Sequence, residues 1–147
     1  MNRTLMAVVI LVSSMSLAFA EETPDEEPPH NVYGLWQLES GSVDVKIADC
    51  GDGTPCGTMI RVDSDQDGIA VDRFNNDPQL AKRPLVGLKM LSGFERYKNG
   101  WKGGTIYNAR NGKSYTSKIM LNSDGTLKVK GCVGPICKTQ TWLRITD

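Results

Sequence analysis

The sequence predicts an all-β protein, a single up-and-down antiparallel β-barrel of about eight strands with minimal helix. Short runs of alternating apolar and polar residues recur along the chain, and this period of two is typical of strands with one buried face. Gly, Asp and Asn separate the runs at the spacings expected of an all-β sandwich or barrel. Because short turns join successive runs, we expect a meander, and closure into a barrel would remove its exposed edges.

The first 20 residues have the features of a secretory signal peptide. Arg3 supplies a positive charge, residues 5–12 are apolar, and residues 18–20 present small side chains before a cleavage point. The apolar run is shorter than the roughly 20 residues of a membrane span; a retained anchor is the alternative. We therefore expect a periplasmic or secreted protein with no membrane span after cleavage.

The mature chain should begin with a short leader and continue as one domain. Residues 21–32 are acidic and rich in Pro, which is typical of a disordered segment. Residues 33–147 are long enough to bury one core, so we expect a single barrel domain there. The chain has 17 Lys and Arg against 17 Asp and Glu, so it lacks the basic excess of a nucleic-acid binder.

The strands can be placed in order from the alternation and from the turn residues between the runs. We expect strands over 33–39, 43–48, 57–62, 85–90 with a continuation over 94–98, two arms of a hairpin within 101–121, and 126–130 and 138–146. The hairpin is the clearest element: Tyr115, Ser117, Ile119 and Leu121 share one face of its second arm, and Asn108, Asn111 and Gly112 form its turn. Residues 63–84 are a long irregular segment, and such segments are usually functional or mobile.

The four cysteines of an exported chain predict disulfides. We favour Cys50–Cys56 and Cys132–Cys137, because each pair brackets a turn that can bring its ends within bonding distance. Zinc binding and free thiols are the alternatives, and zinc sites usually have a tighter spacing.

The run from Asp63 to Gly68 resembles the opening of a calcium loop. Asp63, Asp65 and Asp67 alternate and a glycine follows, but the Glu expected at position twelve is replaced by Phe74. A solvated acidic turn is the simpler interpretation, so these residues are a weak calcium candidate and we expect no cofactor.

No constellation of residues predicts an enzyme. A Ser or Cys nucleophile needs a base, and the one histidine, His30, lies beside the leader without an evident orienting partner. A carboxylate pair could be drawn from Glu39, Glu95 or the acidic loop, but no spacing selects one. We therefore expect a protein that is not an enzyme and has no catalytic residues.

The chain resembles the bacterial family known as domain of unknown function 2147. The matching pieces are Gly34-Leu35-Trp36, Gly57-Thr58-Met59-Ile60, Asp72 to Asn76 with Pro78, Arg83-Pro84-Leu85-Val86-Gly87, and residues 101–108, 111–115, 127–132 and 141–144. The family typically has Asp-Pro where this chain has Asn108-Ala109. The resemblance implies an exported lipocalin-like (calycin) barrel in which Gly34 and Trp36 lie at the closed end and Arg144 covers the tryptophan by cation–π stacking. It implies no established activity.

Two functions fit such a barrel. The first is a carrier or sensor that binds a small hydrophobic or amphipathic molecule, with residues 63–84 as a lid. Its tentative ligand-binding residues are Trp101, Tyr107, Tyr115, Tyr97 and Asn76. The alternative is a filled barrel that binds a protein of the cell envelope, for example as an inhibitor. Large rings are also common in cores, so the aromatic residues do not separate the two.

Overall fold

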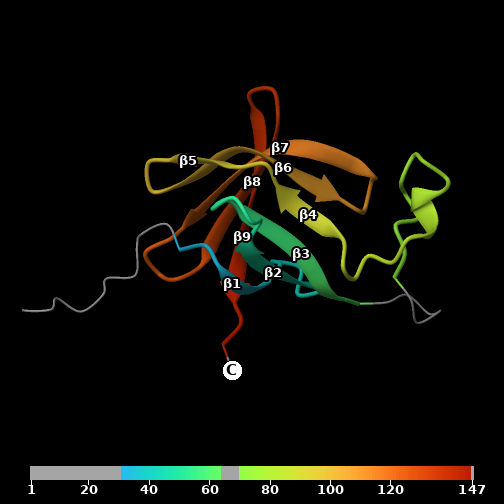
Figure 1. Cartoon of the computed structure of the whole chain (residues 1–147), viewed down its shortest axis with the longest axis horizontal. Helices are drawn as coiled ribbons and strands as arrows, with labels where there is room; N and C mark the ends of the chain where they lie inside the picture. The colour runs from blue at the N-terminus through green and yellow to red at the C-terminus, as the bar shows by residue number, and fades with distance from the viewer. Residues whose placement is uncertain (1–30, 64–69, 147) are drawn as a thin grey trace, which may run out of the picture.

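The computed structural model describes residues 31–63 and 70–146, and these form an antiparallel sheet that curves into a barrel (Figure 1). Its strands are β1 (Gly34–Gln37), β2 (Val43–Asp49), β3 (Pro55–Val62), β4 (Lys89–Ser92), β5 (Glu95–Tyr97), β6 (Gly100–Asn108), β7 (Lys113–Leu121), β8 (Leu127–Val133) and β9 (Ile136–Arg144). One 3₁₀ turn, η1 (Leu80–Lys82), lies in the long connection between β3 and β4. No helix in the described ranges is long and apolar enough to cross a membrane.

The barrel is closed by eight of these strands. The hydrogen-bonded order is β4-β3-β2-β1-β9-β8-β7-β6-β5, and β4 also pairs with β6, which completes the ring. β5 lies outside the ring as a short continuation of β4 along β6. Neighbouring strands are mostly joined by tight turns, so closure leaves few free edges. The predicted all-β barrel of about eight strands is confirmed.

The prediction for the fourth strand was wrong in position. We expected an alternating strand over residues 85–90, but β4 begins at Lys89 and Val86 is 52% exposed. Pro84 pairs with Val71, and the amide of Leu88 donates to the carbonyl of Leu85, so this stretch is a turn. A proline and a glycine within four residues favour that turn over a strand.

The apolar core fills one end of the barrel. Trp101 at the start of β6, Ile119 near the end of β7, Leu127 at the start of β8 and Trp142 near the end of β9 are all buried, and the strand register brings them together. Val32 is also fully buried in this core, although we expected it to belong to a disordered leader. The predicted signal peptide and most of that leader lie outside the described residues.

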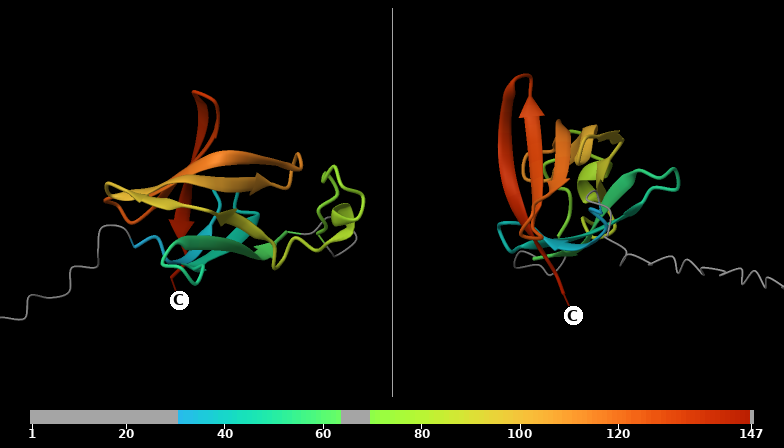
Figure 2. Two further views of the ribbon diagram at one scale, coloured as in Figure 1. Left: turned by 45° about the horizontal axis from the view of Figure 1, so that its top comes forward. Right: turned by 90° about the vertical axis from the view of Figure 1, so that its left-hand side faces the viewer.

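Both predicted disulfides are present. Cys50–Cys56 closes the β2–β3 turn, and Cys132–Cys137 joins β8 to β9 just before their turn. The β8–β9 hairpin projects beyond the rest of the barrel in every view (Figures 1 and 2). The Cys132–Cys137 bridge therefore links the two strands close to the end of this projecting hairpin.

Candidate ligand-binding site

The end of the barrel opposite the tryptophan core contains a cavity of about 1040 Å³. Most of its lining residues are apolar or aromatic, and Ser40, Ser42, Asn108, Asn111 and Gln140 add uncharged polar groups. The apolar and aromatic residues are Leu38, Val43, Met59, Val62, Ala70, Val71, Phe74, Leu85, Met90, Ile106, Tyr107, Ala109, Tyr115, Val129, Val133 and Ile136. The strand residues among them point inward because side chains alternate across a strand. Concave, mostly apolar hollows of roughly this volume are typical of small-molecule sites.

Charged side chains also line this cavity. They are Arg73, Arg110 and Lys138, with Glu39 and Asp63 as the carboxylates. Asp63 accepts a hydrogen bond from Arg61, so part of its charge is already neutralised. The site therefore combines a long apolar wall with cationic groups, an arrangement that suits an amphipathic molecule better than a purely polar one.

One side of the cavity is formed by the irregular segment 70–88, which we call the strap. The strap is fastened to the barrel by Asp72, whose side chain is fully buried. Tyr107 of β6 donates its hydroxyl to Asp72 Oδ1 at 2.6 Å. Arg83 donates Nε to Asp72 Oδ2 at 2.9 Å and its Nη2 lies 2.9 Å from the same oxygen, while Asn75 Nδ2 donates to it at 2.9 Å.

This network satisfies a buried carboxylate, which would otherwise be costly. The Arg83 guanidinium also lies 5.6 Å from the centre of the Tyr107 ring, so it contacts both members of the pair. Burial raises the pKa of the Tyr107 phenol, and the hydrogen bond to the Asp72 carboxylate raises it further. Tyr107 is therefore held as a neutral donor that joins the strap to β6.

The strap also rests on the β6–β7 turn. Gly112 in that turn has φ +66°, and a Cβ there would lie 2.0 Å from the carbonyl oxygen of Phe74. A larger residue would push the strap away, so glycine is required both for the backbone angle and for the close approach. Phe74 lines the cavity from this point.

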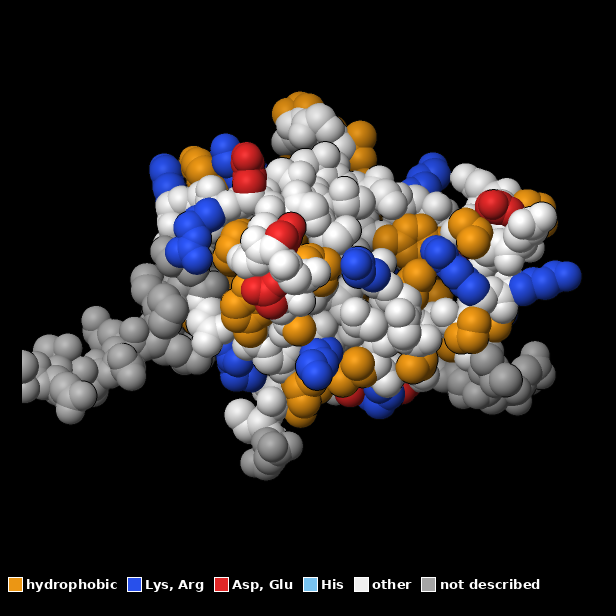
Figure 3. Space-filling model, in the orientation of Figure 1, with side chains coloured by type: hydrophobic (Ala, Val, Ile, Leu, Met, Phe, Trp, Pro, Cys, Tyr) orange, Lys and Arg blue, Asp and Glu red, His pale blue; other side chains and the backbone are white. Residues whose placement is uncertain are grey.

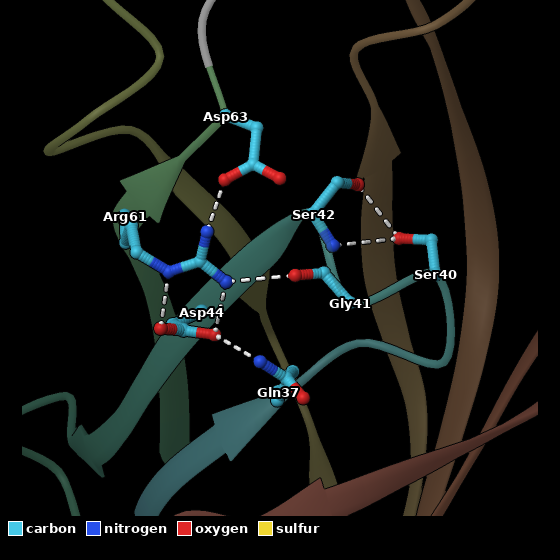
Figure 4. A network of polar contacts seen from close by, with 7 residues as sticks. All are labelled: Gln37, Ser40, Gly41, Ser42, Asp44, Arg61 and Asp63. Carbon is cyan, nitrogen blue, oxygen red and sulfur yellow. Dashed lines mark hydrogen bonds and ion pairs between the residues drawn. The ribbon is translucent and has the colours of Figure 1, made fainter.

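A second polar network holds the strands at the same end of the barrel (Figure 4). Arg61 forms two hydrogen bonds with Asp44, from Nε at 2.6 Å and from Nη2 at 3.0 Å, and Nη2 also donates to the carbonyl of Gly41 at 2.8 Å. Nη1 donates to Asp63. The hydrogen bonds from Arg61 hold the pKa of Asp44 below its usual value. Asp44 and Arg61 do not line the cavity but Asp63 does, so this network fixes the β1–β2 turn beside the cavity.

The closed end has a different construction. Arg144 lies over the Trp36 ring with its Cζ 4.3 Å from the ring centre, and its Nη1 donates to the carbonyl of Tyr33 at 3.0 Å. Trp36 is fully buried, and its indole donates to the carbonyl of Val32 at 2.9 Å. A Cβ on Gly34 would lie 2.7 Å from Arg144 Nη1, so a glycine leaves room for the guanidinium. Gly34, Trp36 and Arg144 therefore meet at a structural plug.

The structure brings together only some of the predicted ligand-binding residues. Tyr107 and Tyr115 line the cavity. Trp101 and Tyr97 instead border a separate hollow of about 150 Å³ towards the opposite end of the barrel. Asn76 is exposed and does not line the cavity.

Strand geometry separates Trp101 from the tyrosines that line the cavity. Trp101 and Tyr107 lie near opposite ends of β6, six positions apart, which separates them by about 20 Å. Trp101 is almost fully buried, and Arg96 lies over its ring at 5.1 Å. It belongs to the core and not to the cavity wall.

Asp72 and Arg83 are the residues that our sequence-based site omitted. The available signal was a carboxylate and an arginine inside one long irregular segment. For the calcium candidate, Asp63 forms an ion pair with Arg61, while Asp65 and Asp67 lie outside the described residues. Within 31–63 and 70–146 no group of three His, Cys, Asp or Glu could hold a metal ion.

A closed eight-stranded barrel with a plugged end and a cavity at the other end is a lipocalin-like architecture. The structure of protein HP1028 from the human pathogen Helicobacter pylori, which belongs to the lipocalin family, is similar to this chain with a TM-score of 0.70. The sequences are 28% identical, and the match covers 80% of this chain and 85% of that one.

A sequence comparison identifies the family of this chain. Residues 34–144 match the family described as uncharacterized protein conserved in bacteria (DUF2147), so the chain belongs to this family. The match spans all nine described strands, from Gly34 to Arg144. No curated protein sequence matches the chain.

Proposed function

We propose that this protein binds a small hydrophobic or amphipathic molecule in the open end of its barrel, as a carrier or sensor. The observation that carries the proposal is the cavity of about 1040 Å³ with its mostly apolar lining. Leaving such a surface exposed to water is unfavourable by about 25 cal/mol per Å², so an apolar ligand of the right size would gain free energy by covering it. The function proposed is binding and not catalysis.

The lining favours a molecule with one apolar and one polar end. The apolar part would lie against Met59, Met90 and Val129 near the middle of the barrel. A polar or anionic group would then reach the mouth, where Arg110 and Lys138 are exposed. The ligand in this proposal is therefore an amphiphile that enters with its apolar end first.

We also propose that the protein acts in the periplasm or after secretion. Its two disulfides are typical of proteins in oxidising compartments. The signal-peptide features of residues 1–20 agree with that location.

The first test is native mass spectrometry of the protein purified from the envelope of its own host. A retained small apolar mass that is lost on denaturation would support the carrier and define its cargo. A binding assay with the fluorescent probe N-phenyl-1-naphthylamine then tests the position of the site. Val62 on β3 lines the cavity, so V62W should narrow it and weaken probe binding about tenfold or more.

A matched control is available on the same strand. Ile60 is exposed on the outside of β3, so I60W adds the same side chain without entering the cavity and should bind the probe like wild type. Equal probe binding by V62W and wild type would count against this cavity. A protein that retains no cargo and binds no probe would favour the filled-barrel interaction module.

A further inference from the structure

The projecting β8–β9 hairpin ends in an apolar tip that the cavity does not need for its own closure. Val133 is 65% exposed and Ile136 is 77% exposed, and Pro135 between them is also exposed. Hydrophobic side chains lie at the top of the space-filling view, where the β8–β9 hairpin projects (Figure 3). Isolated exposed apolar residues are common, but three within four positions at the end of a projecting hairpin form an apolar patch.

A disulfide fixes the shape of the tip. The disulfide between Cys132 and Cys137 links the two strands directly below the turn, so the apolar side chains are presented without a large ordering cost on binding. Val133 and Ile136 also line the rim of the cavity. Whatever covers this tip therefore lies beside the mouth of the proposed ligand site.

The charge of the surrounding wall identifies the partner's chemistry. The net charge of the whole chain is zero, but the charges are distributed unequally. Residues 96–146, which form most of β5 and all of β6 to β9, contain ten Lys and Arg and a single carboxylate, Asp124. No Asp or Glu occurs from Gly125 to Thr146, and Lys138 lies next to the disulfide at the tip. Arg96 and Arg144 lie over Trp101 and Trp36 toward the other end of the barrel, so the cations of the hairpin nearest the tip are Lys130 and Lys138. A hairpin that carries lysines and no carboxylate attracts an anionic surface.

The shape of the tip favours a bilayer over a protein. It is convex and offers three apolar side chains, whereas each partner in a stable protein interface contributes about 800 Å² from 20–30 residues. A short apolar projection flanked by cations is suited to the bilayer interface, where the apolar groups enter the headgroup boundary and the cations approach anionic lipids.

We infer that the β8–β9 tip docks the protein on an anionic phospholipid bilayer through Val133, Pro135 and Ile136, with Lys130 and Lys138 of the same hairpin near the lipid headgroups. This docking would place the mouth of the cavity at the membrane surface, where an amphiphile could pass between bilayer and barrel. The docking itself needs no ligand in the cavity, because the exposed side chains of the tip would contact the bilayer directly.

The test is vesicle flotation with protein purified from the host envelope. Vesicles of phosphatidylglycerol and phosphatidylcholine should bind the wild type, vesicles of phosphatidylcholine alone should bind it less, and added salt should weaken the difference. The double variant V133S/I136S should have an affinity for the anionic vesicles at least about tenfold lower, since it removes the apolar contact. All variants share the same N-terminus, so differences between them do not arise from residues before the barrel.

L143S is the matched control. Leu143 is an apolar residue on the same strand, 53% exposed, but it lies at the opposite end of β9 from the tip. It should bind vesicles like wild type. V62W, which narrows the cavity and does not touch the tip, should still float with anionic vesicles, which separates this inference from the ligand proposal. Docking is overturned if the wild type does not float with anionic vesicles, if V133S/I136S binds as well as wild type, or if L143S loses binding to the same degree. Equal binding to both kinds of vesicle would overturn the role of the hairpin lysines.

Discussion

Replacing Asp72 with Asn tests whether one buried carboxylate holds the strap against the barrel. The substitution keeps the shape of the side chain and removes its charge. Asp72 Oδ2 accepts hydrogen bonds from Arg83 Nε and Asn75 Nδ2 and forms an ion pair with Arg83 Nη2. Asp72 Oδ1 accepts a hydrogen bond from the hydroxyl of Tyr107. An amide has one acceptor oxygen, so it cannot accept from both sides of this network at once.

The expected loss follows from the kind of hydrogen bond that is removed. Hydrogen bonds to a charged group contribute about 1.5–3 kcal/mol each, and breaking a buried ion pair costs about 3–5 kcal/mol. The Arg83 side chain is 33% exposed and can regain water, which reduces the loss. We therefore expect D72N to weaken docking of the strap by roughly 2–4 kcal/mol, while the barrel strands keep their own hydrogen bonds.

Amide hydrogen exchange measures this loss locally. The amide of Asp72 donates to the carbonyl of Arg83, and that of Leu85 donates to the carbonyl of Ala70. Both should exchange about 30- to 1,000-fold faster in D72N, with strand amides of β7 and β8 unchanged.

The control for this experiment is D77N in the same strap. Asp77 is exposed and accepts a hydrogen bond from the amide of Gln79, without a buried ionic partner. Strap exchange in D77N should remain close to that of wild type. The reasoning would be refuted by wild-type protection of the strap in D72N, or by an equal loss in D77N.

Two further predictions concern Tyr107 and Trp36. Because the pKa of Tyr107 is raised in the folded protein, its contribution to stability is complete below the unfolded value of about 10 and is lost as the pH rises through the folded value. Urea unfolding at a series of pH values should therefore show a steeper loss above pH 10 in wild type than in Y107F, and parallel curves would contradict this. Trp36→Ala should lower the free energy of unfolding by about 3–5 kcal/mol, because it empties a fully buried site beneath Arg144. Trp36→Phe should lose less, and a W36A variant with the wild-type urea midpoint would disprove the plug.

The sequence predicted those parts of the fold that depend on local signals. Alternation in residues 113–121 placed Ser117 and Ile119 correctly on the buried face of β7. The disulfides were predictable because each pair of cysteines brackets a tight turn, and both bonds are present. The error at 85–90 arose because apolar residues around Val86 form a turn, where alternation has no meaning.

The site was harder to predict because it depends on contacts between distant residues. Alternation tells which side of a strand faces inward, but it does not tell which end of a barrel a residue occupies. Trp101 and Tyr107 illustrate this limit, since they lie near opposite ends of one strand. The Tyr107–Asp72 hydrogen bond joins residues 35 positions apart, and the position of an irregular segment carries no periodic signal.

Stability of the barrel and access to the cavity depend on different residues in this structure. Trp36 is covered by Arg144 at the plugged end, whereas the strap beside the cavity is held by the polar contacts of Asp72. Polar contacts of this kind can break without exposing the tryptophan core, so the strap can move while the barrel remains folded. W36A should therefore lower the global stability with little change in the protection of the strap relative to the strands. D72N should leave the global stability nearly unchanged while the strap amides exchange hydrogen faster. N-phenyl-1-naphthylamine should also enter and leave the cavity faster in D72N.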